Sequence, residues 1–202
     1  MFSLCQFTPR QLATTLAGVR SLPLSYPTPF GVEKGPQQAL CPPCYKLDHT
    51  RSQIGQGESA FAAAQALLRS WQHFDLGWVR IANPEAPIAI GEIIAVEACA
   101  LGLWSLNLSR ILTVIDEQPP SGPHRFGFVY GTTPHHVERG EECFLLEFDP
   151  VTGAVHYDLL AISHPAHLLA QLAYPFTRSQ QHRFARESHA RMAQVVSEAI
   201  RS

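Results

Sequence analysis

Charge and long apolar runs are both scarce in this chain. Only 16% of its 202 residues are charged, and the formal net charge is −2. A chain with this balance is not expected to be a general nucleic-acid binder. No run of about 18 apolar residues occurs, so no transmembrane helix is predicted, and the N-terminus lacks the pattern of a signal peptide. The hydrophobic content of 46% is enough for a large core, an internal cavity or a partner surface.

Several motifs of catalysis and metal binding are also missing. There is no GxSxG elbow, no HExxH helix and no HxH pair, so covalent catalysis has no support and no cofactor is predicted. Cys41 and Cys44 form the one CxxC step, with His49 as the nearest further donor. This step is open to three interpretations: ordinary thiols, half a zinc site or a redox pair. Five scattered cysteines favour a reduced, cytoplasmic setting.

The N-terminal part reads as a short helix followed by an arm. Thr8-Pro9-Arg10-Gln11 carries the residues of a capping box with proline at the first helical position. Prolines and glycines then break the pattern from Ser21 to Pro43, which predicts an extended arm. We therefore expect residues 1–44 to form an N-terminal helix and a Pro-rich arm, and residues 45–202 to form a single α+β domain.

Hydrophobic periodicity predicts a sheet between helices. A turn at Ile54–Gly57 leads into an amphipathic helix from about Glu58 to His73. Ser163 is placed to cap a short helical segment carrying Leu169 and Leu172, and a longer helix is expected from about Phe176 to Ile200. The fold class is α+β, with a curved antiparallel β-sheet packed on a long C-terminal helix. Short turns separate the expected strands, which span Trp78–Ile81, Ile88–Ala98, Leu106–Asp116, Arg125–Tyr130, Glu142–Asp149 and Ala154–Ile162.

The stretch from Phe126 to Phe144 gathers most of the candidate chemistry. In an extended chain His136 and Glu138 point to one side, and Glu141 and Glu142 add carboxylates nearby. A histidine beside carboxylates is suited to acid–base work, whereas exposed loop polarity is the simpler interpretation. Several aromatic side chains either line an apolar cavity or form plain core: Trp71, Trp78, Trp104, Phe126, Phe128, Tyr130 and Tyr157.

These residues resemble a known family. Tyr130-Gly131-Thr132-Thr133-Pro134-His135-His136, followed by Gly140-Glu141-Glu142, is similar to the YGTLPGH…GEE signature of the DUF1990 (UPF0548) family. Thr133 and His135 depart from it, where the family has Leu and Gly. The resemblance runs from about Tyr45 to Met192 and includes three further segments, which are Ile54–Gly57 with Phe61 and Trp71, Gly102–Ser105 with Arg110, and Ser163–Ala166.

The resemblance implies no established activity. The order of elements is similar to that of helix-grip proteins, the START-like and polyketide-cyclase-like group, which hold apolar ligands. Such folds usually begin with a strand ahead of the first helices, and no strand is predicted there in this chain.

Three functions follow as hypotheses. The first is a protein that binds a small apolar or amphipathic ligand between sheet and C-terminal helix, with Tyr130, His136 and Glu142 orienting a polar group. The second is a metal-independent enzyme, a hydrolase, isomerase or cyclase, in which His136 acts with Glu141 or Glu142. The third is an interaction protein that docks through its Pro-rich arm; no motif sets an oligomeric state. The candidate ligand-binding residues are Trp104, Arg110, Tyr130, Gly131 and Thr132.

Overall fold

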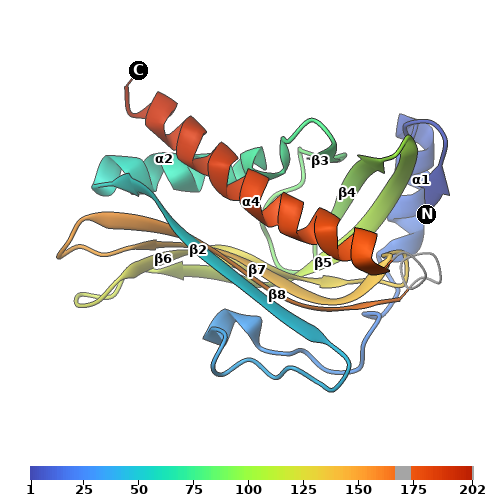
Figure 1. Ribbon diagram of the computed structural model, residues 1–202, viewed down its shortest axis with the longest axis horizontal. Helices are drawn as coiled ribbons and strands as arrows, with labels where there is room; N and C mark the ends of the chain where they lie inside the picture. Colours follow the sequence, from blue (N-terminus) through green and yellow to red (C-terminus); the bar gives the residue numbers. More distant parts are fainter. Residues whose placement is uncertain (167–173, 202) are drawn as a thin grey trace.

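A computed structural model describes residues 1–166 and 174–201. Its centre is one antiparallel sheet that curves around the long C-terminal helix α4 (Figure 1). The expected α+β architecture, a curved antiparallel sheet packed on a long C-terminal helix, is confirmed.

The sheet has the strand order β2-β8-β7-β6-β5-β4-β3, with β1 added beside β5. From β3 to β8 each strand pairs with the next one in the chain, as a meander does, and β2 closes the far edge by pairing with β8. The strands are β1 (Phe2–Ser3), β2 (Lys46–Gln56), β3 (Val79–Ile81), β4 (Ile93–Ala100), β5 (Leu103–Glu117), β6 (His124–Thr132), β7 (Glu138–Phe148) and β8 (Ala154–Pro165).

Helices α2 and α4 cover the concave face of the sheet, and α1 and the N-terminal arm cover the convex face (Figure 1). The capping box predicted at Thr8 is present, with Thr8 and Gln11 each bonding the other's backbone N–H. The helices are α1 (Pro9–Val19), α2 (Glu58–Arg69) and α4 (Tyr174–Ala199), and the 3₁₀ turns are η1 (Val32–Lys34) and η2 (Gln72–Phe74).

The two halves of α4 pack in different ways. Its C-terminal half buries Met192, Val195 and Val196 in the main core, against α2 and the sheet. Its N-terminal half carries Phe176, Gln180 and other side chains that line a cavity instead. The solid core therefore fixes the helix at one end, and the sheet and helix enclose space at the other.

Two expectations about local structure are corrected. Lys46–Gln56, which was given no strand, forms β2 and supplies the strand that precedes α2. Its side chains are largely polar and exposed, so the segment lacks the hydrophobic alternation that predicts a strand. Ser163, expected to cap a helix, lies inside β8; Leu169 and Leu172 of that expected segment lie outside the described residues.

The Pro-rich arm packs on its own sheet. Tyr26, Phe30 and Val32 are at most 6% exposed and contact the convex face at a cluster that includes Val129 and Leu160. Two polar contacts add to this packing, since the Tyr26 hydroxyl and the Phe30 backbone N–H both donate to Glu141 Oε1 at 2.9 Å. These three apolar side chains are thus occupied within the chain, which argues against this part of the arm as a docking segment.

Candidate functional site

A cavity of about 990 Å³ lies between the N-terminal half of α4 and the concave face of the sheet. Alternate residues of the central strands point into it, because side chains in a strand alternate between the two faces. The lining is mostly apolar and includes Phe74, Trp78, Val96, Leu159 and Phe184. A volume of this size lies at the upper end of the range of about 300–1,000 Å³ found for small-molecule sites.

Apolar side chains meet solvent at the rim of this cavity. Leu101, at the tip of the β4–β5 hairpin, is 91% exposed, and Phe176, near the start of α4, is 38% exposed. Both belong to the residues that line the cavity. The rim between the hairpin and α4 is therefore apolar, which suits the passage of an apolar ligand.

A hydrogen-bonded pair, Tyr130 and Glu142, sits on the floor of the cavity. The two residues lie opposite each other on β6 and β7, and the Tyr130 hydroxyl donates to Glu142 Oε2 at 2.6 Å. Burial raises the pKa of the Glu142 carboxyl to about 7, with the Tyr130 hydrogen bond opposing the rise and the charges of Glu138 and Asp48 adding to it. Glu142 is thus close to half protonated at neutral pH.

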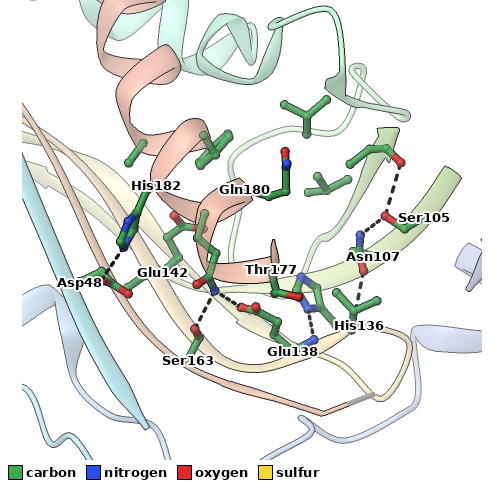
Figure 2. A pocket seen from close by; sticks show the side chains of 18 of the residues that line it. Asp48, Ser105, Asn107, His136, Glu138, Glu142, Ser163, Thr177, Gln180 and His182 are labelled. Atoms are coloured by element: carbon green, nitrogen blue, oxygen red, sulfur yellow. Dashed lines mark hydrogen bonds and ion pairs between the residues drawn. The ribbon is translucent and has the colours of Figure 1, made fainter. Parts of the chain in front are cut away.

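Further polar groups form a band beside this pair (Figure 2). Gln181 donates to Glu138 Oε2 at 2.5 Å and to Ser163 Oγ at 3.1 Å. Burial raises the pKa of Glu138 as well. Asp48, from β2, accepts two hydrogen bonds from Arg178 at 2.5 and 2.6 Å. Strands and α4 therefore meet through polar contacts on this side of the cavity.

His136, in the loop between β6 and β7, also lines the cavity (Figure 2). The backbone N–H of Glu138 donates to His136 Nδ1 at 3.0 Å. Burial lowers the pKa of His136 to about 4, so the ring is neutral at pH 7. Because Nδ1 accepts a hydrogen bond, the ring proton resides on Nε2. His136 therefore offers a neutral N–H donor rather than a base.

The structure brings some of the predicted site residues together and separates others. Tyr130, Thr132, His136 and Glu142 line the cavity. Trp104 packs instead in the cluster beneath α1. Arg110 donates to the backbone carbonyls of Val19, Arg20 and Leu22 at the end of α1.

Gly131 and Glu141 face the arm. A Cβ at Gly131 would lie 2.1 Å from the Tyr26 hydroxyl, and the Glu141 carboxylate accepts from that same hydroxyl. Neither Gly131 nor the Glu141 carboxylate is therefore placed to act on a group beside His136. The cause is alternation along the strand, which turns neighbours of Tyr130 and Glu142 to the convex face.

Sequence reasoning missed the residues that β2 and α4 contribute. Asp48 and Thr50 come from the unpredicted strand, and Gln180 and Gln181 come from the predicted helix. The helix signal was present, but the polar face of α4 resembled an ordinary solvent-facing surface. Only the pairing of distant segments shows that this face closes a cavity.

The cysteine pair gains no further ligand. Cys41 and Cys44 are exposed, and His49 bonds Asp158 at 2.9 Å. In residues 1–166 and 174–201, no three His, Cys, Asp or Glu side chains are grouped to hold a metal ion. None of the helices described combines the length and hydrophobicity that a membrane span requires.

Replacing Glu142 by Gln is expected to stabilise the protein at alkaline pH. The pKa of Glu142 is about 7 in the folded state and near 4.5 when unfolded, so the folded state binds the extra proton between these values. The contribution of Glu142 to stability is therefore complete below about pH 4.5 and is lost as the pH rises through about 7. Glu142→Gln should raise the free energy of unfolding by about 1–3 kcal/mol at about pH 8, and by almost nothing at about pH 4.

Urea unfolding at several pH values measures this difference. Glu147→Gln is the matched control, because Glu147 lies on the same strand but pairs with Arg51 at 2.6 Å on the convex face. The control should be neutral or slightly destabilising at pH 8. A pH-independent effect of Glu142→Gln would contradict the raised pKa.

Comparison with known proteins identifies relatives along most of the chain. Residues 31–191 match the family model described as "Domain of unknown function (DUF1990)". A UPF0548 protein of Dictyostelium discoideum is 38% identical over 158 residues, covering 75% of this chain and 73% of the relative. A UPF0548 protein of Deinococcus radiodurans is 35% identical over 204 residues, covering 95% of this chain and 96% of the relative.

Solved structures show only weak likeness. A crystal structure of a protein from Thermus thermophilus is 13% identical, with a TM-score of 0.49, over 76% of this chain and 99% of that chain. Norcoclaurine synthase from Thalictrum flavum, in complex with dopamine and hydroxybenzaldehyde, is 7% identical, with a TM-score of 0.43, over 76% of this chain and 87% of that chain. Likenesses of this size carry no argument about ligand or activity.

Proposed function

The chain belongs to the DUF1990 (UPF0548) family, and we propose that it binds a small apolar or amphipathic ligand in the cavity between its sheet and α4. The observation that carries this proposal is the cavity itself, about 990 Å³ in volume and lined mostly by apolar side chains. Burial of apolar ligand surface supplies the affinity. Tyr130, His136 and Glu142 orient the polar end of the ligand.

The composition of the lining supports binding rather than simple loose packing. Natural cores are close-packed, and an apolar space of this size lowers stability unless something fills it. Here the space is bounded by polar groups on one side and by an apolar rim, which is the usual arrangement of a small-molecule site. Packing of the C-terminal half of α4 on the solid core holds the helix in place, so its N-terminal half can lie over the cavity.

Filling the cavity is expected to abolish binding. Ala161 lies on β8 among the lining residues, and Ala161→Trp would place an indole inside the cavity. The fluorescent apolar probe N-phenyl-1-naphthylamine should bind the wild type saturably, and Ala161→Trp should weaken this binding about 10-fold or more. Ala62→Trp, on the exposed face of α2, is the control of equal bulk and should bind as the wild type does.

The cavity-filled variant should also keep its fold, because it adds volume where space exists. Its melting temperature should stay near that of the wild type. Saturable probe binding that is unchanged by Ala161→Trp would place the probe elsewhere and contradict the proposal.

A second candidate function is a metal-independent enzyme, and the state of Glu142 favours it. A carboxyl whose pKa is about 7 is suited to donate and accept a proton near neutral pH. In this version Glu142 acts as the acid or base, and the neutral His136 Nε2–H stabilises negative charge that develops on the substrate. The test is conversion of a co-purified ligand, which should depend on a group that titrates near pH 7 and be lost in Glu142→Gln.

A further inference from the structure

The cavity carries two acidic side chains that form no ion pair with any described residue, although the charge of Arg178 opposes the rise in the pKa of Glu138. Glu138 and Glu142 both line it, and neither forms an ion pair with an arginine, lysine or histidine of the described residues. Asp48 differs, because Arg178 donates to both of its oxygens. Arg186 lines the cavity as well, but its side chain is 70% exposed and lies 3.6 Å from Glu187. The interior therefore has an excess of acid.

The same groups have unused capacity to accept hydrogen bonds. In the part of the chain that the structure describes, Tyr130 is the donor that reaches Glu142, and it bonds Oε2, which leaves Oε1 without a donor. Gln180 Oε1 is buried and has no hydrogen-bond partner among the described residues. Gln180 extends from α4 over the cavity, on the side opposite the strands that carry Glu138 (Figure 2). Hydrogen-bond acceptors therefore line the cavity on both the sheet side and the α4 side.

A buried acceptor without a donor is costly, and a buried carboxylate without a partner is more so. A ligand that brings hydrogen-bond donors and positive charge removes both costs at once. A ligand carboxylate would add a third negative charge beside Glu138 and Glu142, which is unfavourable at short range in a poorly solvated site.

Resting on the proposed binding function, we infer that the ligand is an amphipathic amine whose protonated nitrogen is bound by Glu142. The apolar part then lies against the aromatic and aliphatic lining, which includes Phe74 and Phe184. The Tyr130 hydroxyl holds the carboxylate of Glu142 in position. His136, being neutral, adds no competing charge.

Binding of an amine is linked to the proton on Glu142. Glu142 is about half protonated at pH 7 when the site is free, and an ammonium beside it favours the carboxylate, so binding should release about half a proton per site at that pH. Affinity for the amine should therefore rise as the pH rises from about 6 to about 8. The charged or titratable groups that face Glu142 are Tyr130 on β6, Glu138 on β7, Tyr157 on β8, and Asp48 on β2 with its partners Arg178 and His182 on α4.

Three probes with one chain and different heads test the inference: decylamine, decan-1-ol and decanoate. Titration calorimetry at about pH 7.5 and about 0.15 M salt should show decylamine binding about 10-fold or more tighter than decanol, and decanoate weakest. Glu142→Gln should lose this preference for the amine and the proton release. Glu147→Gln, on the convex face, should behave as the wild type.

The possible outcomes separate the two proposals. Equal binding of the three probes, or a preference for decanoate, overturns the amine inference and leaves the cavity as an apolar site. A preference for decylamine that survives in Glu142→Gln overturns it too, because the recognising group is then elsewhere. Saturable binding of none of the three overturns the proposed function as well. Proton release measured in buffers of different ionisation enthalpy is a readout that a purely structural role of Glu142 would not move.

Discussion

Gly140→Ala is expected to remove most of the stability of this protein. Gly140 lies on β7 with φ +151°, and a Cβ built there would be 1.8 Å from the backbone carbonyl oxygen of Ile162 on β8. Because the obstacle is the backbone of a paired strand, no side chain can rotate away to relieve it. Strain and overpacking together predict a loss of about 3–5 kcal/mol, a large part of the roughly 5–15 kcal/mol that holds a typical domain folded.

Gly140 also supports the site. Its N–H donates to Thr132 Oγ1 at 2.9 Å, and its strand neighbours Glu138 and Glu142 line the cavity. Thermal unfolding should show a melting temperature lower by about 10 °C or more. Gly102→Ala is the matched control, because Gly102 also has positive φ, +78°, but has nothing within 4 Å of its added Cβ. The control should lose only about 1–2 kcal/mol; equal losses at both positions would contradict the steric argument.

His73→Phe is expected to stabilise the protein, and increasingly so in acid. His73 is fully buried among the rings of Trp71, Phe74, Phe128, Phe144 and Tyr157. Neither of its ring nitrogens has a hydrogen-bond partner within the described residues. Replacing this imidazole by a phenyl ring removes two unsatisfied polar atoms and should add about 1–3 kcal/mol at neutral pH.

The acid dependence follows from the pKa of His73, which burial lowers to about 3 from an ordinary 6.5. Between these values the unfolded state binds the proton and the folded state does not, so the wild type loses stability as the pH falls from about 6.5 towards 3. His73→Phe removes this loss, and its advantage should grow by about 2 kcal/mol between pH 7 and pH 5.

Denaturant unfolding at pH 7 and pH 5 measures both the gain in stability at neutral pH and its increase in acid. His124→Phe serves as control, because His124 is only half buried and already meets Phe148 edge to face; it should change stability little at either pH. Since phenyl is slightly larger than imidazole, His73→Leu is a second variant that should show the same pH trend. If neither variant has a higher free energy of unfolding than the wild type, or if the difference does not grow in acid, His73 has a hydrogen-bond partner in the folded protein.

The sequence predicted this fold where local signals are strong. The capping box at Thr8, the amphipathic pattern from Glu58 and the Val- and Ile-rich strands each depend on near neighbours in the chain, and each is present. The polar strand β2 depends on pairing with β8, about 100 residues away, so its own residues did not reveal it. Long-range pairing of this kind overrides local propensity.

The structure brings only some of the proposed site residues together, for a related reason. Tyr130, His136 and Glu142 line the same cavity because one hairpin carries them all. Trp104 and Arg110 were proposed as ligand-binding residues as well, yet they face α1. Both faces of this sheet are covered, so its strands are apolar on both sides, and alternation alone does not say which side faces the cavity.

The mass of freshly purified protein under non-denaturing conditions tests the central claim most directly. If the space beneath α4 is a ligand site, native spectra should show the 202-residue chain with an added organic mass, displaced by decylamine and absent from Ala161→Trp. A bare chain that also takes up no added amphiphile would contradict the account.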